Sequence, residues 1–293
     1  MPRFFGQIGA VLVLAVVAGG MAFSLAGSGP LAIDSWWQAH IAAPAGTPAH
    51  AVAAFLAVVG GSVGAAICFV IAVVALLIFG RFRDALAVAG AGVLGTAGSE
   101  LLKRSVQRPR PTDQLFSSHG SSYPPGHTVA AAALAVSLAL VALGARGFDR
   151  RLARVAVVLA VVWTLAMMWS RTALHVHWLT DTLAGAALGI GVALVARSLC
   201  VPSRPYDSLN TPGETIIFGA DWCGDCRRAK RVFDEAGASY RYVDLIVEES
   251  AAEVAREISG RTNIPVILYP DRSHQVEPSN AAMLAKIAEL GLA

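Results

Sequence analysis

Up to about residue 200, the chain alternates between long apolar segments and short polar connections. A helix needs about 20 residues to cross the hydrocarbon core of a bilayer, and six segments meet or approach this length. Charged residues bound them, and the small side chains inside them favour close helix packing in lipid. They cover approximately residues 4–25, 51–79, 85–102, 128–145, 155–169 and 179–199. The pattern predicts an all-α bundle of six transmembrane helices.

The first apolar segment, 4–25, has a second interpretation as a secretory signal peptide. Arg3 precedes it as a basic start, and Ser24-Leu25-Ala26 forms a weak cleavage site. Its apolar run is longer than the apolar region of a signal peptide, which favours a retained span.

After about residue 200 the pattern changes to short apolar runs separated by amphipathic, charged stretches. Strands are expected at 215–218, 240–245 and 266–269, and helices at 226–236, 250–258 and 280–290. A proline-containing stretch separates this pattern from the last apolar segment. The chain is therefore predicted to hold a membrane domain over 1–200, a linker over 201–212 and a small α/β domain over 213–293.

Composition and charge agree with this division and narrow the partners. The 293 residues are 55% hydrophobic and only 15% charged, which excludes an ordinary soluble protein. The net charge of +3 is spread over short connections instead of one patch, and this argues against nucleic acid as a partner.

The basic residues of the connections predict an orientation. Arginines cluster at the N-terminus and after the second, fourth and sixth segments, whereas 27–50 contains neither Lys nor Arg. The positive-inside rule then places both termini in the cytoplasm, and 103–127 and 170–178 on the outer face of the plasma membrane. Basic residues kept on that disfavoured face need a chemical explanation, which an anion site supplies. They are Lys103, Arg104, Arg108, Arg110 and Arg171.

The connection 170–181 places an arginine, a histidine and a carboxylate at the mouth of a membrane helix. His177 and Asp181 are four residues apart, so in a helical segment they share one face, where the carboxylate orients the imidazole. A histidine prepared in this way serves as a nucleophile or general base. The alternative is a polar collar where the helix leaves the lipid.

Further polar side chains are predicted to gather at the same outer helix ends. Guanidinium and ammonium groups suit a tetrahedral dianion, and Gly126 lets the backbone approach a ligand at a helix N-terminus. Two histidines, one as nucleophile and one as acid for the leaving alkoxide, complete a phosphoryl-transfer site that needs no cofactor. A zinc site is the rival, although three cations would repel a bare metal ion. The residues are Lys103, Arg110, His127, Arg171, His177 and Asp181.

Three motifs in these connections resemble the type-2 phosphatidic acid phosphatase family. Residues 103–111 read K-x6-R-P, 124–127 read P-P-G-H, and 170–181 read S-R-x5-H-x3-D. The first and third match the family pattern at every defining position, and the resemblance covers about residues 50 to 200.

The resemblance implies a role for each motif residue. His177 is expected to attack phosphorus and form a phosphohistidine, Asp181 to orient His177, and His127 to protonate the leaving group. The expected phosphate ligands are Lys103, Arg110, Ser170 and Arg171.

One position departs from the family pattern. Pro125 replaces the motif serine and has neither a hydroxyl nor an N–H group. Loss of one such donor costs about 2.7–4 kcal/mol of transition-state stabilisation. The leading hypothesis is a phosphatase for a lipid phosphate or polyprenyl pyrophosphate at the outer leaflet. The alternatives are a weakened phosphatase domain that mainly anchors the tail, and a phosphotransferase with an acceptor other than water.

The tail carries a C-x-x-C pair between its first strand and first helix. The helix N-terminus stabilises a thiolate, so Cys223 is predicted to be the attacking sulfur and Cys226 the resolving one. Half of a zinc site is the alternative, but no second cysteine pair follows.

With Ile264-Pro265 before the third strand, where the thioredoxin fold carries a cis proline, residues 213–293 resemble glutaredoxins. The form Trp222-Cys223-Gly224-Asp225-Cys226 looks most like the mycoredoxin type. This resemblance implies that Ile264 and Pro265 bind a thiol substrate, either a low-molecular-weight thiol or a protein disulfide. A cytoplasmic location suits such a dithiol because that compartment is reducing.

Overall fold

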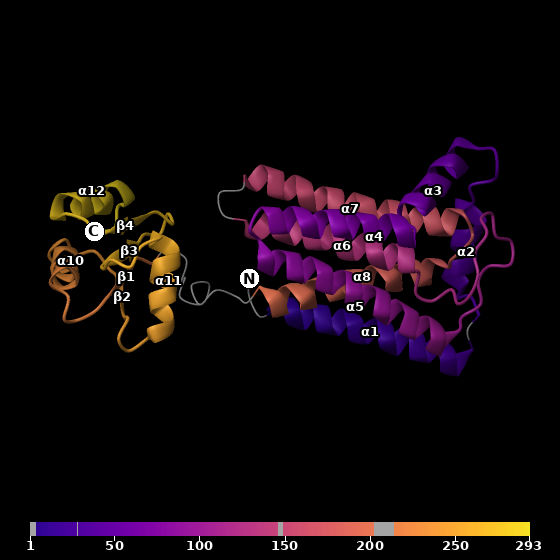
Figure 1. Ribbon diagram of the computed structural model, residues 1–293, viewed down its shortest axis with the longest axis horizontal. Helices are drawn as coiled ribbons and strands as arrows, with labels where there is room; N and C mark the ends of the chain where they lie inside the picture. The colour runs from indigo at the N-terminus through magenta and orange to yellow at the C-terminus, as the bar shows by residue number, and fades with distance from the viewer. Residues whose placement is uncertain (1–3, 28, 146–148, 202–213) are drawn as a thin grey trace. The chain divides into compact units, whose positions relative to one another are not determined.

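Figure 1 shows the computed structural model of the chain, which describes residues 4–27, 29–145, 149–201 and 214–293. The described residues form two compact units, a helical one before the linker and an α/β one after it. Of the predicted linker 201–212, all but Val201 lies outside the described residues, and so does Arg3.

The helical unit is a bundle of long apolar helices joined by shorter ones. Five described helices are long and apolar enough to cross a membrane, and many of their large apolar side chains are exposed on the outside of the bundle, where lipid would cover them. They are α1 (Phe4–Ala26), α5 (Phe82–Val106), α6 (Gly126–Gly144), α7 (Arg150–Ala173) and α8 (Leu179–Cys200). The predicted helical membrane fold is confirmed, and the count of six spans stays a prediction.

The apolar segment 51–79 is not the single helix that its composition predicts. It forms α3 (Pro48–Val59) and α4 (Ser62–Ile78), which are bent by 58° and amount to a sixth span only if taken together. The bend falls at Gly60 and Gly61, because glycine is a poor helix former. A side chain at Gly60 would overlap Met167 of α7, so the corner packs directly on that helix.

A short helix, α2 (Ala32–Ile41), lies at the end of the bundle opposite the N-terminus of α1 (Figure 1). Sequence periodicity did not predict it, because ten residues are too few for a clear pattern. Its Asp34 is buried while Trp36 is exposed, so the helix turns a polar side chain inward.

Helix α8 packs against α1, α5 and α6 at the centre of the unit. Glycines allow the close approach. A Cβ atom on Gly191 would lie 2.9 Å from the carbonyl oxygen of Gly9 in α1, and one on Gly189 would lie 2.5 Å from that of Val129 in α6. Small residues of this kind let helix backbones approach each other in lipid, where dispersion contacts drive packing.

The second unit is a four-stranded sheet with helices on both faces, as the predicted α/β domain requires. Its strand order is β2-β1-β3-β4, with β1 parallel to β2 and the other pairs antiparallel. Alternate residues of β1 point to opposite cores, Ile217 toward α10 and α12, and Ile216 toward α11. The elements are β1 (Ile216–Gly219), α10 (Gly224–Glu235), β2 (Arg241–Asp244), α11 (Glu249–Ser259), β3 (Val266–Leu268), β4 (His274–Val276) and α12 (Asn280–Leu290).

Strand β4 was not predicted from the sequence. It has only three residues, His274 to Val276, and none of them is fully buried. Its polar composition gives no apolar alternation, and it exists because β3 offers a free edge after a tight turn.

The helix packing generates a paired test. In Gly189→Ala the new methyl group meets the α6 backbone, and overpacking of this kind costs about 1–3 kcal/mol. Gly98→Ala is the matched control, because its Cβ atom would meet only Leu188, at 3.9 Å. Thermal unfolding in detergent should show a lower Tm for the first variant and an equal or higher Tm for the second. Equal Tm values would contradict this account of the α6–α8 contact.

Candidate functional site

The outer helix ends predicted to hold the site do meet in the structure. The last turn of α5, the first turns of α6 and α8, and the turn between α7 and α8 converge at the same end of the unit as α2 (Figure 1). Lys103 belongs to the last turn of α5 and not to a loop as expected, because that helix continues until Gln107 adopts a left-handed conformation. The connection then resumes at Arg108.

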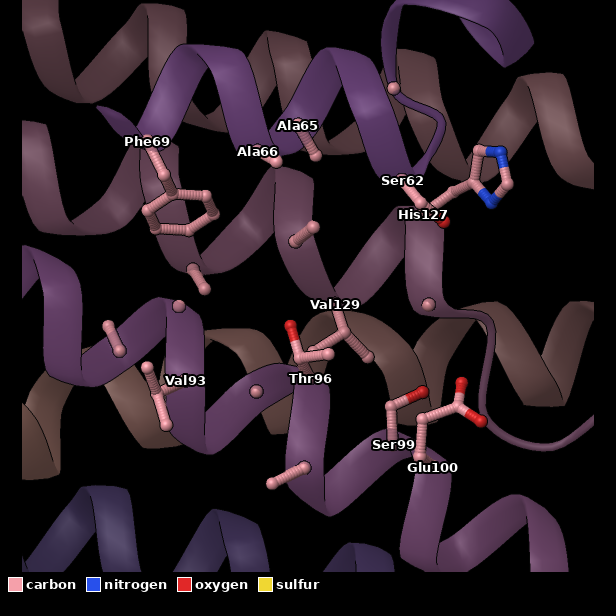
Figure 2. Close-up of a pocket in the computed structure, with 18 of the residues that line it drawn as sticks. Ser62, Ala65, Ala66, Phe69, Val93, Thr96, Ser99, Glu100, His127 and Val129 are labelled. Carbon is pink, nitrogen blue, oxygen red and sulfur yellow. The ribbon is translucent and has the colours of Figure 1, made fainter. Parts of the chain in front are cut away.

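A cavity of about 860 Å³ opens between α4, α5 and α6 at this end. Its polar end is lined by Lys103, Arg110, Gly126, His127 and His177. The remainder is lined mainly by small and apolar residues, including Ala65, Ala66, Phe69, Val93, Val129 and Ala133. In Figure 2, His127 and Glu100 lie on opposite walls near the polar end, and Phe69 and Val93 lie toward the apolar end. One cavity therefore joins a cationic end to an apolar trough.

His177 presents one ring nitrogen to the polar end of this cavity. Its Nδ1 lies 2.6 Å from the carbonyl oxygen of Ser122, and its Nε2 lies 3.0 Å from Nη1 of Arg110. A carbonyl oxygen can only accept, so Nδ1 carries the hydrogen and Nε2 holds the free electron pair. Burial, followed by the charge of Arg110, lowers the pKa of His177 well below its ordinary value. The ring is thus a neutral imidazole with its nucleophilic nitrogen toward the cavity.

The predicted contact between Asp181 and His177 is wrong in its geometry. His177 lies in the turn before α8, and that helix begins at Leu179 after Trp178 as N-cap. Asp181 folds back to accept the Trp178 N–H at 3.0 Å, as acidic residues in a first helical turn commonly do. Its Oδ2 also accepts from the hydroxyl of Ser122, and among the described residues it makes no hydrogen bond to His177.

Arg110 fixes the connection that covers the site. Its guanidinium donates to the carbonyl oxygens of Val176 at 2.7 Å and Gly120 at 2.9 Å, and to those of His119 and Ser121 at 3.1 and 3.3 Å. Lys103 instead pairs with Glu100 at 2.7 Å, one turn earlier on α5. Both cations line the cavity, so an anion that enters it would replace these hydrogen-bond and ion-pair partners.

Two predicted phosphate ligands lie outside the cavity lining. Ser170 donates to the carbonyl oxygen of Ala53 in α3 at 2.7 Å, and its Oγ accepts from Nη2 of Arg171 at 2.8 Å. The Nε atom of Arg171 is buried and unpaired in the described part of the chain. Ser170 therefore holds Arg171 in place, and the structure does not bring either residue to the cavity as a phosphate ligand.

Pro125, which replaces the motif serine, is the N-cap of α6 and also lies outside the cavity lining. Its ring packs on α8, with Cδ at 3.1 Å from a Cβ atom built on Gly185. Gly126 reaches the cavity instead, and a Cβ atom there would lie 3.4 Å from Nζ of Lys103.

Two residues of the site escaped the sequence analysis. Arg108 is fully buried and binds Asp181 at 2.5 Å and Asp34 of α2 at 2.8 Å. Arg108 was noted only as a basic residue on the outer face. Asp34 is the one acidic residue between positions 27 and 50. The sequence signal for its role is that it stands alone on the same predicted face as the basic residues of 103–127. For the rival zinc site, no group of three His, Cys, Asp or Glu side chains that could hold a metal occurs among the described residues.

The C-x-x-C pair sits at the N-terminus of α10. Cys223 is its N-cap, and its Sγ accepts the Cys226 N–H at 3.2 Å and lies 3.8 Å from the carbonyl oxygen of Ile264. The Ile264–Pro265 peptide bond is cis. Burial, together with the hydrogen bond to Cys223, raises the pKa of the fully buried Cys226 to about 12. Cys223 is the sulfur nearer to solvent.

Comparisons with known proteins agree with both resemblances. The PAP2 superfamily matches residues 84–203, and the glutaredoxin family matches residues 215–274. Mycoredoxin 1 of Corynebacterium glutamicum is 32% identical over 75 residues, which cover 25% of this chain and 92% of that protein.

Two solved structures are similar to the helical unit, and the first of them shares its fold. One is a PAP2-type phosphatidylglycerolphosphate phosphatase from Bacillus subtilis, with a TM-score of 0.56 and 22% identity over 65% of this chain and 94% of that one. The other is LpxE of Aquifex aeolicus, with a TM-score of 0.46 and 21% identity over 57% of this chain and 95% of that one. The C-terminal domain therefore belongs to the glutaredoxin family, and it is joined to a PAP2-like membrane domain whose residues 84–203 match the superfamily.

Proposed function

We propose that the membrane domain is a phosphatase that hydrolyses a lipid phosphate or polyprenyl pyrophosphate at the outer leaflet. The observation that carries this proposal is the cavity that joins Lys103, Arg110, His127 and His177 to an apolar trough between α4, α5 and α6. A lipid phosphate has the same division, with an anionic head and an apolar tail. A soluble phosphate ester would leave the trough empty.

In the first chemical step, Nε2 of His177 attacks phosphorus and the bond from phosphorus to the leaving oxygen breaks. His127, which lies on the opposite wall of the cavity from Glu100 (Figure 2), is the residue that gives a proton to the leaving oxygen in this step. The lone pair of Nε2 cannot accept a hydrogen bond from Arg110 and bond to phosphorus at the same time, so Arg110 releases His177. Arg110 then binds the phosphate oxygens together with Lys103.

In the second step, water attacks the phosphohistidine and the bond between phosphorus and nitrogen breaks. His127, now neutral, takes a proton from this water, which releases inorganic phosphate and restores both histidines. The carbonyl oxygen of Ser122 holds Nδ1–H throughout, so His177 keeps its orientation in both steps.

The outward orientation of the site remains part of the proposal. It rests on the cationic residues of the opposite end, such as Arg81 and Arg197, and on the positive-inside rule. With the site outside, the tail follows α8 into the cytoplasm.

We propose a second activity, thiol–disulfide exchange, for the C-terminal domain. The thiolate of Cys223 attacks a mixed disulfide and displaces one thiol, and Cys226 then attacks the new disulfide and displaces the other. The products are two free thiols and the Cys223–Cys226 disulfide, which a low-molecular-weight thiol reduces again. Cys226 is fully buried behind Cys223, and this order of attack suits the structure.

The phosphatase proposal is tested by a substrate screen with the parent protein and His177→Ala. Phosphatidate, phosphatidylglycerophosphate and polyprenyl pyrophosphate are offered in detergent micelles, and released phosphate is measured. At least one lipid should be hydrolysed by the parent, with a loss of at least about a thousandfold in the variant, because the nucleophile is gone. The control is His274→Ala, an exposed histidine of β4 in the other domain. If no lipid shows hydrolysis that depends on His177, the membrane domain is an anchor for the tail.

The buried, neutral state of His177 predicts a pH dependence. A lowered histidine pKa keeps the free electron pair present at lower pH, so the His177-dependent acid limb of kcat/KM should lie below 6.5. Arg110→Gln removes one of the charges that lower this pKa and should move the limb to higher pH, besides weakening phosphate binding. Arg104→Gln, which removes an exposed charge nearby, should leave the limb in place. A limb that stays unchanged in Arg110→Gln would contradict the assigned state of His177.

The two cysteines should behave differently with a glutathionylated peptide as probe. Cys223→Ser should lose the reaction, whereas Cys226→Ser should accumulate a mixed disulfide on Cys223 that intact-mass spectrometry detects. Cys68→Ser and Cys200→Ser, in α4 and α8, should react like the parent. Trapping on Cys226 instead of Cys223 would reverse the assignment.

A further inference from the structure

A chain of buried polar side chains continues behind His177, on the side away from the cavity. It runs from His177 to Ser122, Asp181, Arg108 and Asp34, and each of these residues is at most 5% exposed. The last four do not line the cavity, so they do not touch a ligand held there. Their effect on the reaction has to pass through His177.

Ser122 is the link between the carboxylate and the imidazole. Its carbonyl oxygen accepts Nδ1–H of His177 at 2.6 Å, and its hydroxyl donates to Oδ2 of Asp181. The Ser122 hydroxyl oxygen lies 3.5 Å from Nδ1, and the Ser122 N–H donates to the carbonyl oxygen of Arg108 at 2.8 Å. Asp181 therefore holds the residue that holds His177.

Arg108 and Asp34 fix Asp181 from the other side. The guanidinium of Arg108 lies between the two carboxylates and 3.9 Å from the ring centroid of Phe23. Asp34 also accepts the N–H and the hydroxyl of Thr180 in the first turn of α8. In a buried network of this kind each charged group is held in place by its partners.

We propose that Ser122 and Asp34 are positioning residues of the phosphatase site. Ser122 transmits the hold of Asp181 to His177, and Asp34 fixes Asp181 through Arg108. The two carboxylates offset part of the positive charge of Arg108 and Arg110 around the imidazolium that forms when phosphorus bonds to Nε2 while Nδ1 stays protonated. This inference rests on the proposed role of His177 as nucleophile. It differs from a direct pair of Asp181 and His177, in which Ser122 and Asp34 would have no part.

The link through Ser122 is tested with Ser122→Ala, Asp181→Asn and the double variant, using the lipid that the parent hydrolyses. Each single variant should lower kcat by at least about tenfold with KM within about twofold. The double variant should have a kcat no lower than that of the less active single variant. Ser121→Ala is the matched control, since among the described residues the neighbouring Ser121 hydroxyl forms hydrogen bonds only with the backbone of Tyr123. Activity of Ser122→Ala within about twofold of the parent, or losses that multiply in the double variant, would overturn the link.

A second test separates a positioning role of Asp34 from the simpler role of anchoring helix α2. Asp34→Asn should lower kcat by about tenfold and move the His177-dependent acid limb of the pH profile, because Arg108 then pairs with Asp181 alone. Asp113→Asn is the control. Asp113 also binds α2, through Gln38 at 2.5 Å, and pairs with His175 at 2.8 Å, outside the network. If both variants lose activity equally, Asp34 only anchors α2 and the proposal fails.

Two measurements keep the outcomes separate. Thermal unfolding in detergent shows whether a variant is folded, and if Ser122→Ala does not fold, the comparison of Asp34→Asn with Asp113→Asn decides. The parent and His177→Ala run in every assay. If the parent shows no His177-dependent hydrolysis, the proposed function fails and this inference with it. If the parent is active and the variants match it, only this inference fails.

Discussion

The end of the helical unit that holds the candidate site depends on the burial of one guanidinium group. Arg108 is fully enclosed, and an uncompensated charge in that position would cost several kcal/mol, so carboxylates have to surround it. Asp34 comes from α2 and Asp181 from α8, while Arg108 itself follows α5. Because both carboxylates must lie next to the buried guanidinium, the three segments that carry these residues are held in fixed positions. The turn that carries His177 is held between them.

The same region divides its cations by function. Arg108 is neutralised by two carboxylates behind the site, whereas Lys103 and Arg110 reach the cavity through contacts that an anion can replace. If the proposed orientation holds, these basic residues oppose the usual charge asymmetry of membrane proteins, and their roles explain them, because one group is structural and the other faces the cavity. The apolar trough continues from this cationic end, which is why a lipid ligand fits the arrangement.

Both candidate sites of the chain use a helix N-terminus, with different results. At α8 the Asp181 carboxylate accepts a backbone N–H of its own first turn, and this draws it away from His177. At α10 the Cys223 sulfur accepts the N–H of Cys226, and this keeps the attacking sulfur at the helix end, next to Ile264. In each case unpaired N–H groups of the first turn decide where a reactive side chain points.

The membrane class, most helix positions, the three motifs and the C-x-x-C pair can be read from the sequence, because apolar periodicity and motif spacing are local properties. The sequence did not predict the break at Gly60 and Gly61, and the close packing of Gly60 on Met167 of another helix is visible only in the tertiary structure. Only the tertiary structure joined Asp34 to Arg108, 74 residues away, and placed Ser122 between Asp181 and His177. These pairings are decided by charge compensation and packing between distant segments, and spacing along a chain carries no information about them.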